Sequence, residues 1–219
     1  MRKLTSILLL FIMYSISVNA QKVVYGDEVQ KRDISGFTAV ETSSGIAVIL
    51  TKGDKEELAV SVGNVNYLDE IKTIVQGGVL KISRSDNWKL WNRWKNWKAT
   101  VYVSYIHLNE LQARSGGSIK GTDLDLSSLH TRFSSGGIIT LNGKVNSLTL
   151  DGSSGGQLKA YGLITEKCFA EVSSGAGAQI TVTKEISAKA NSGGFIRYKG
   201  EGLIRDINVN SGGSVKRQD

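Results

Sequence analysis

The stretch Ser115-Gly116-Gly117 recurs along the second half of the chain at a nearly constant interval. Its later copies begin at Ser135, Ser154, Ser174, Ser192 and Ser211, and only the copy at Ser174 ends in alanine instead of glycine. Successive serines are 20, 19, 20, 18 and 19 residues apart. A period this short and regular is typical of a solenoid, in which each repeat forms one coil and not a separate domain.

Apolar and polar residues alternate on both sides of every serine. The residue four positions after it is apolar in all repeats: Ile119, Ile139, Leu158, Ala178, Ile196 and Val215. The residues four and two positions before it are mostly apolar, down to Ile207 and Val209 in the last repeat. The residue three positions before it is polar or charged: Gln112, Arg132, Asp151, Glu171, Lys189 and Asn208. Since alternate residues of a strand share a face, the apolar sets predict inward columns and the polar set predicts an outward column.

The alternation and the repeat length together predict an all-β parallel β-helix with coils of about 19–20 residues. A helical repeat would place apolar residues every three or four positions and would tolerate so many glycines poorly. The Ser-Gly-Gly motif is expected at a bend between two strands of one coil, where glycine supplies unusual backbone angles. The equivalent serines are expected in one inward column, where stacked hydroxyls can hydrogen-bond to each other.

The N-terminus has the pattern of an export signal. Two basic residues precede an apolar run from Leu4 to Ile16, and a small-residue cleavage pattern ends at Ala20. This pattern predicts a secretory signal peptide over residues 1–20, because the apolar run is too short for a comfortable membrane span. We therefore expect an exported protein, periplasmic or at the cell surface, with no transmembrane segment after the signal is removed.

Residues 21–219 are expected to form a single β-helical domain. A coil with the shortened motif Ser44-Gly45 opens it, an insertion over residues 51–104 follows, and the regular coils occupy residues 105–219. Alternating stretches of the insertion predict antiparallel strands at residues 58–62, 80–82 and 101–103, with a helical turn within residues 67–74. The insertion is expected to cover one end of the solenoid, because an open end invites edge-to-edge pairing.

All four tryptophans of the chain fall in one short stretch, interleaved with basic residues. The candidate contact residues are Trp88, Trp91, Arg93, Trp94, Trp97 and Lys98. Aromatic rings beside cations can stack on sugars or bases, or lie at a membrane interface. The alternative is a hairpin whose indoles pack on a neighbouring sheet while the cations extend into solvent. One buried face cannot easily hold four tryptophans, so we expect at least one of them to be exposed.

Asp151 and Glu171 are expected to be neighbours on consecutive coils, about 5 Å apart. Enzymes with a β-helix, such as pectate lyases and polygalacturonases, gather several carboxylates on one face. Here Arg132 and Lys189 flank the pair, no further acid joins the column, and no histidine or tyrosine approaches it in the pattern. The spacing therefore favours a charge ladder over a catalytic pair, and a polysaccharide lyase or hydrolase is the alternative function.

The sequence offers no motif for a metal or cofactor site, and none is expected. His107 and His130 are the two histidines, and neither has a cysteine or a second histidine at metal-ligand spacing. The single cysteine, Cys168, shares the parity of Ala170 and Val172, which predicts a small buried side chain. The net charge of +7 is spread along the chain and does not by itself indicate nucleic-acid binding.

Several stretches together resemble a known family. They are the signal peptide, the opening from Phe37 to Leu50, the segment from Asn66 to Ile71 that leads to Gly78–Ile82, and the Ser-Gly-Gly coils. They resemble the putative auto-transporter adhesin, head GIN domain family (DUF2807), over nearly all of the chain after the signal. The resemblance implies a right-handed β-helix and an adhesin-like role in exported proteins of Bacteroidetes-type bacteria. It supplies no catalytic residues.

These observations lead to two main hypotheses of function. The first is an exported, non-catalytic module that binds a glycan, an envelope component or a protein, because long solenoid faces suit extended ligands. The second is the β-helix enzyme that uses Asp151 and Glu171. A structural envelope protein without a tight ligand is a third. The sequence does not indicate the oligomeric state.

Overall fold

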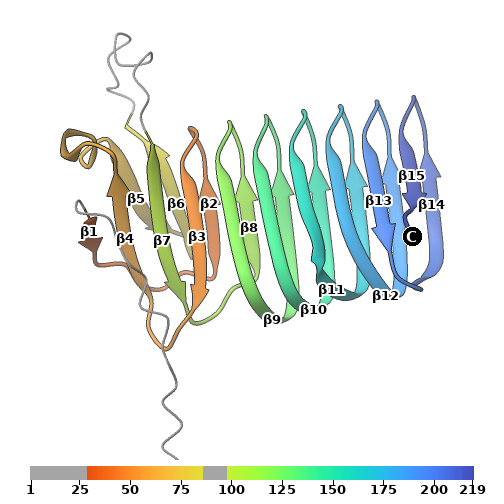
Figure 1. Cartoon of the computed structure of the whole chain (residues 1–219), viewed down its shortest axis with the longest axis horizontal. Helices are drawn as coiled ribbons and strands as arrows, with labels where there is room; N and C mark the ends of the chain where they lie inside the picture. The colour runs from red at the N-terminus through yellow and green to blue at the C-terminus, as the bar shows by residue number, and fades with distance from the viewer. Residues whose placement is uncertain (1–28, 86–97) are drawn as a thin grey trace, which may run out of the picture.

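The computed structural model describes residues 29–85 and 98–219, and these residues form an all-β solenoid (Figure 1). The strands are β1 (Val29–Arg32), β2 (Ala39–Thr42), β3 (Ala47–Lys52), β4 (Glu57–Val62), β5 (Ile71–Gln76), β6 (Val79–Arg84), β7 (Ala99–Tyr105), β8 (Glu110–Ala113), β9 (Ser118–Phe133), β10 (Ile138–Gly152), β11 (Gln157–Val172), β12 (Gly177–Ala190), β13 (Phe195–Lys199), β14 (Leu203–Val209) and β15 (Ser214–Arg217). A 3-10 turn, η1 (Val65–Tyr67), interrupts them. Among the described residues, no helix has the length and apolar character that crossing a membrane requires.

Each regular coil consists of two strand segments that run in opposite directions, and the coils stack in parallel along one axis. In Figure 1 the Ser-Gly turns lie along the upper edge, and the bends inside the long strands β9 to β12 lie along the lower edge. The segment that follows each turn forms the face toward the viewer, here called the front face. The segment that precedes each turn forms the opposite, back face. The coils wind in a right-handed sense, and the predicted parallel β-helix is confirmed.

The Ser-Gly turns have a specific backbone geometry. Ser135 and Gly136 both have positive φ, 49° and 73°, and Gly137 N–H donates to Ser134 O at 2.8 Å, as in a type I′ turn. A Cβ on Gly137 would lie 2.1 Å from Ala113 O of the preceding coil, so this position needs glycine. The turn is therefore a two-residue reversal packed tightly against its neighbour.

The serines do not form an inward column, contrary to the expectation from the sequence. Ser115, Ser135 and the later motif serines are exposed at the tips of the turns. The bonds between neighbouring turns are made by the backbone: Gly116 N–H donates to Ser135 O at 3.1 Å, and the later coils repeat this contact. The prediction fails because the serine itself adopts a positive φ, which ends the alternation of the strand at that residue.

The predicted inward columns form the core. Ile119, Ile139, Leu158, Ala178 and Ile196 are in register on successive strands, and each is almost fully buried. The last coil is the exception, because its large apolar residues are exposed: Leu203, Ile204, Ile207 and Val209. Strand β14 pairs with β12, and no further described strand stacks on its other side. The parity is therefore correct throughout, but burial is lost where the stack ends.

The insertion extends both faces of the first coil and covers the N-terminal end of the solenoid. On the front face, β7 pairs in parallel with β3 and antiparallel with β4, and β4 pairs antiparallel with β1. On the back face, β6 pairs in parallel with β2 and antiparallel with β5. The predicted antiparallel cap is confirmed. The helical turn expected within residues 67–74 is mostly wrong, because η1 lies at Val65–Tyr67 and strand β5 already begins at Ile71.

Cys168 lies in the core, as its parity predicts. It is 1 % exposed and aligns with Leu148 and Ile186 of the neighbouring coils. Burial away from water raises the pKa of its thiol to about 12, so the side chain is a neutral part of the core at physiological pH.

Candidate functional site

The predicted tryptophan-rich contact site lies almost entirely outside the described residues. This applies to Trp88, Trp91, Arg93, Trp94 and Trp97. Lys98 is described: it is exposed and directly precedes β7, one of the strands of the cap. The stretch therefore joins the two strands β6 and β7, and its role in binding stays a prediction.

The back face carries the predicted outward column, with its acids and bases in register. Gln112, Arg132, Asp151, Glu171, Lys189 and Asn208 align on successive strands. Arg132 lies between two acids: its Nη1 is 3.5 Å from Glu110 Oε1, and its Nε is 4.0 Å from Asp151 Oδ2. A shallow hollow of about 310 Å³ opens beside these side chains. Asp151 and Glu171 are thus adjacent, as predicted.

A histidine approaches the acids, contrary to the expectation from the sequence. His130 Nε2 lies 2.7 Å from Asp151 Oδ2. The two residues come from adjacent strands but are offset by two positions, so a comparison of equivalent positions alone does not pair them. Asp151 therefore shares its carboxylate between a histidine and an arginine.

Glu171 differs from Asp151 in its surroundings. It aligns with Lys189, but within residues 29–85 and 98–219 no cation lies within 4.0 Å of its carboxylate. Two positions earlier on the same strand, Phe169 is 54 % exposed. In the charge ladder predicted from the sequence, Asp151 therefore forms ion pairs, whereas Glu171 forms none with the described residues.

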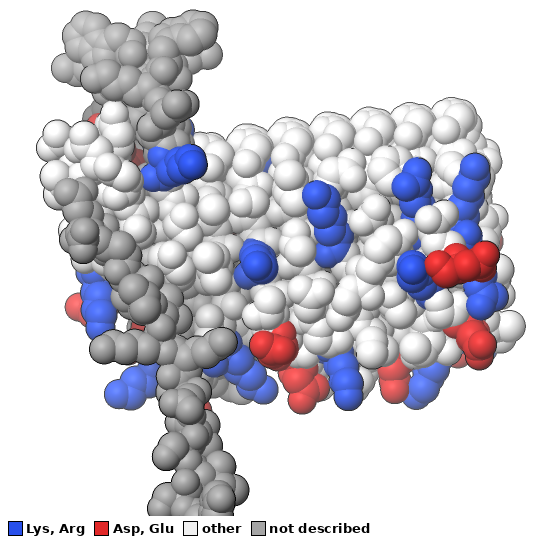
Figure 2. All heavy atoms as spheres, viewed as in Figure 1, with Lys and Arg blue, Asp and Glu red and all other residues white. Residues whose placement is uncertain are grey.

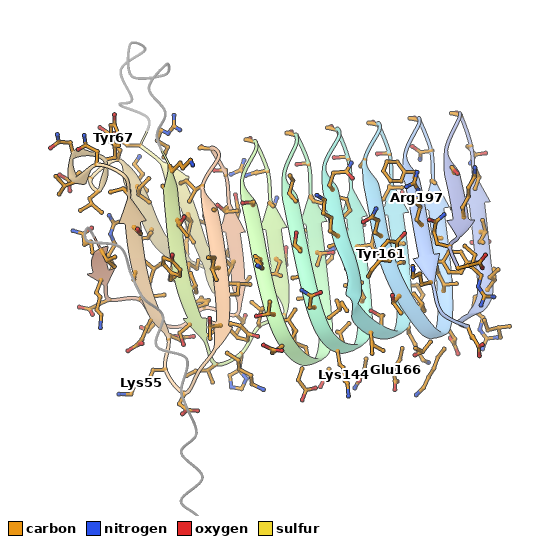
Figure 3. The ribbon with its side chains drawn as sticks, viewed as in Figure 1. Lys55, Tyr67, Lys144, Tyr161, Glu166 and Arg197 are labelled. Atoms are coloured by element: carbon orange, nitrogen blue, oxygen red, sulfur yellow. The ribbon has the colours of Figure 1, made fainter. Side chains whose placement is uncertain are left out.

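The front face carries a second outward column, in addition to the one predicted from the sequence. It contains the residues five positions after each serine: Lys120, Thr140, Lys159, Gln179, Arg197 and Lys216. In Figure 2 a row of basic side chains crosses the middle of this face, while acidic groups gather along its lower edge and at its C-terminal end. Figure 3 shows Arg197 and Tyr161 on these front strands. Counting five positions after each serine identifies this front column in the sequence, just as counting three positions before each serine identifies the back column.

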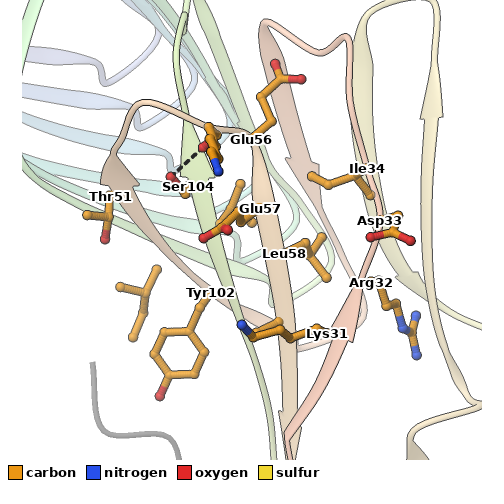
Figure 4. Close-up of a pocket in the computed structure, with 14 residues that line it drawn as sticks. Lys31, Arg32, Asp33, Ile34, Thr51, Glu56, Glu57, Leu58, Tyr102 and Ser104 are labelled. Carbon is orange, nitrogen blue, oxygen red and sulfur yellow. Dashed lines mark hydrogen bonds between the residues drawn. The ribbon is translucent and has the colours of Figure 1, made fainter. Parts of the chain in front are cut away.

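The front column continues onto the cap and reaches a hollow. Lys120 aligns with Ile49, Ile49 with Tyr102, and Tyr102 with Ala59. Over these strands lies a hollow of about 450 Å³, which Lys31, Glu57 and Thr51 also help to line (Figure 4). Ser104 Oγ donates to Lys55 O at 2.7 Å across one of its walls. The hollow is open and mixes apolar, basic and acidic groups.

Arg32 and Glu185 also have pKa values shifted by their surroundings, and both serve structure. Burial lowers the pKa of Arg32, which donates to Leu68 O at 2.7 Å and to Thr73 Oγ1 at 3.1 Å and so ties β1 to the back of the cap. A hydrogen bond from Arg205 lowers the pKa of Glu185 on the exposed surface. In the part of the chain that the structure describes, no cluster of His, Cys, Asp and Glu could hold a metal ion.

The family described as "Putative auto-transporter adhesin, head GIN domain" matches residues 36–202. The chain belongs to that family. The match begins just before the first coil and ends at the last bend, so the resemblance seen in the sequence is confirmed. No match is found among curated proteins.

Solved structures share the fold of this GIN domain. A putative adhesin from Bacteroides fragilis is 18% identical, with a TM-score of 0.65 over 88% of this chain and 98% of that chain. A putative lipid binding protein from Parabacteroides distasonis is 20% identical, with a TM-score of 0.52 over 88% of this chain and 96% of that chain. At these identities the likeness shows a common overall fold.

Proposed function

We propose that this protein is an exported, non-catalytic adhesin module that holds an extended partner, a glycan or another component of the cell envelope, against its flat faces. The observation that carries the proposal is the regular front face, where outward side chains repeat at the strand spacing over all the regular coils. A rigid, periodic surface suits a periodic ligand, because each coil can repeat the contact made by the one before. Membership of the GIN-domain adhesin family supports a binding role, and the signal-like N-terminus supports export.

The geometry of the back face argues against the alternative, a polysaccharide lyase or hydrolase. Asp151 is half exposed and already engaged by His130 and Arg132 on an open surface. Glycoside hydrolases place two carboxylates on either side of the scissile bond, with one of them held as a general acid. The His130–Asp151 contact is the one feature that would serve an enzyme, so the test of function must include it.

Retention and turnover measured on the same protein separate the two functions. We expect the purified protein to be retained on an immobilised cell-envelope fraction or on a glycan surface. We also expect it to release no reducing or unsaturated sugar ends from acidic polysaccharides. The variants Asp151→Ala, Glu171→Ala and His130→Ala should leave both results unchanged. Sugar ends released by the wild type and lost in any of these variants would establish the enzyme instead.

The tryptophan-rich stretch is proposed as a second contact region. Its four indoles are the only ones in the chain, so tryptophan fluorescence reports on residues 88–97 alone. We expect at least one Trp→Ala change to leave the melting temperature unaltered and to abolish retention on the envelope fraction. Four tryptophans that resist acrylamide quenching and are each needed for stability would refute a contact role.

A further inference from the structure

The cations of the front face have no acidic partners in the described structure. Five basic residues point outward from the front strands of the regular coils: Lys120, Lys159, Arg197, Lys199 and Lys216. Within residues 29–85 and 98–219, no carboxylate lies within 4.0 Å of any of them. The ion pairs found in this part of the chain belong to the back face and the lower bends. A row of exposed like charges without counter-charges attracts partners of the opposite charge, so it favours an anionic ligand.

Three of these cations are evenly spaced, while Lys216 lies directly beside Arg197 on the next strand and Lys199 lies on the same strand as Arg197. Lys120 and Lys159 are separated by one intervening coil, and so are Lys159 and Arg197. With neighbouring strands about 4.8 Å apart, these three cations recur about every 9–10 Å. The intervening positions, Thr140 and Gln179, carry a hydroxyl and an amide that can bond to sugar hydroxyls.

Aromatic rings hold two of the cationic side chains in place. The guanidinium carbon of Arg197 is 5.3 Å from the centre of the Phe195 ring, and Lys199 Nζ is 5.3 Å from the centre of the Tyr161 ring. The Phe195 ring lies against the backbone of Gly177 on the preceding coil, where a Cβ would come within 2.2 Å of the ring. These contacts restrict the side chains before any ligand binds, which lowers the entropic cost of binding.

We propose that the front face binds an extended acidic polysaccharide that carries one carboxylate on every second sugar. The polymer runs along the solenoid axis, and its carboxylates meet Lys120, Lys159 and Arg197 in turn. A sugar in an extended chain is about as long as the strand spacing, so alternate sugars match alternate coils. At the cap, the same track reaches the hollow beside Ile49 and Tyr102. This inference rests on the binding function proposed above and assigns its ligand class and its face.

Two other polyanions fit the face less well. In double-stranded DNA the phosphates of one strand recur about every 3.4 Å of helix axis, closer than these cations. Binding of single strands uses uncovered aromatic rings. The surface of an anionic membrane is met by basic residues together with inserted apolar side chains. The exposed large apolar residues of the described structure lie away from the front column, for example Phe169 on the back face. An acidic glycan is therefore the partner that the charge pattern favours.

The test uses hyaluronan oligosaccharides long enough to span the regular coils, because hyaluronan carries one carboxylate on every second sugar. Neutral dextran, single-stranded DNA and vesicles with an anionic lipid are measured in parallel. We compare Lys120→Gln, Lys159→Gln and Arg197→Gln, singly and together, with Lys189→Gln as the matched control on the back face. Each front variant should raise the Kd about twofold to fivefold, and the triple variant roughly 10- to 100-fold. Lys189→Gln should leave the Kd unchanged, and added salt should weaken wild-type binding.

Several results would overturn the inference. They are an equal loss in Lys189→Gln, no loss in the front variants, or DNA or vesicles binding as tightly as hyaluronan and losing affinity in the same variants. The single variants keep the test valid if the triple variant does not fold. Retention on the envelope fraction distinguishes failure of this inference from failure of the proposed function. A protein that is retained there but ignores hyaluronan refutes this inference alone, whereas a protein retained by neither refutes the proposed function as well.

Discussion

On the back face, Arg132 lies between the carboxylates of Glu110 and Asp151, whereas on the front face Lys159 aligns with Thr140 and Gln179. Both side chains project outward from a strand beside a Ser-Gly turn and over the same core, Arg132 three positions before Ser135 and Lys159 five positions after Ser154. The back face therefore satisfies much of its charge internally, and the front face leaves its charge for a partner.

This difference shows how the solenoid separates stability from binding. The inward positions and the turns fix the frame, since every coil stacks its apolar side chains on those of its neighbours. The outward positions contribute little to that frame, so their chemistry can differ between faces without changing the fold. Function in such a protein is determined by the outward columns and by which of them remain unpaired.

The largest effect should come from a charge placed inside the frame that both faces share. Ile139→Asp buries a carboxylate among Ile119, Leu158 and the rest of the core. A carboxyl there must either stay charged without a partner or take up a proton and lose its hydrogen bonds to water. Either cost removes much of a domain's stability of about 5–15 kcal/mol, so the variant should not fold. Thr140→Asp, one residue further and facing outward, is the matched control and should fold. Circular dichroism and thermal melting distinguish the two, and a cooperatively melting Ile139→Asp protein would break the assigned register.

A smaller effect is expected from two neighbours on the back strand that point in opposite directions. Cys168→Ser places a hydroxyl in the apolar core and should lower the free energy of unfolding by about 1–3 kcal/mol. Phe169→Ser changes an exposed side chain and should cost at most about 0.5 kcal/mol. Chemical denaturation of both variants measures the difference, and equal losses would contradict the alternation on this face.

The thiol of Cys168 provides a second test that this position is buried. Its pKa is raised to about 12 in the folded protein, against about 8.5 in an unfolded chain. The folded state therefore keeps its proton over a pH range in which the unfolded state loses it, and stability should fall as pH rises above about 8.5. At pH 8 a thiol reagent should label Cys168 only after unfolding. Rapid labelling of the native protein would show that the core is open there.

The smallest effects should distinguish the charges of the two faces. Arg132→Gln removes the partner of Glu110 and Asp151 and should cost up to about 1 kcal/mol, less at high salt. Lys159→Gln removes a cation without a described partner and should leave stability within about 0.5 kcal/mol or raise it slightly. Melting temperatures at low and high salt test both variants. A stability loss in Lys159→Gln that salt reduces would reveal an ion pair on the front face.

Much of the fold could be predicted from the sequence because a repeat of fixed length multiplies a weak signal. Alternation around one serine is ambiguous, but Ile119, Ile139 and Leu158 occupy the same position in successive repeats and identify a column. Counting positions in the repeats does not show where the stack ends. The pattern therefore predicts interior positions for Ile207 and Val209, which are exposed in the structure. It also could not show that the serine adopts a positive φ, because serine does not favour that conformation.

The candidate site was harder to predict than the fold. The back column follows from the residue three positions before each serine, whereas the contact of His130 with Asp151 does not, because it joins different positions of two repeats. The front column was missed although the same count reveals it, since lysines separated by Thr140 and Gln179 look unremarkable in a linear sequence. Whether a carboxylate lies near these lysines depends on the three-dimensional arrangement, so the sequence does not show that their charges are unpaired.

The central claim is that the front face, and not the back face, contacts the ligand. Lysine acetylation followed by mass spectrometry tests it within a single molecule, with and without hyaluronan oligosaccharides. Lys120, Lys159 and Lys216 should become protected when the ligand is present, while Lys189 on the back face should react at its original rate. Protection of Lys189 with continued reactivity of Lys120 and Lys159 would contradict the account.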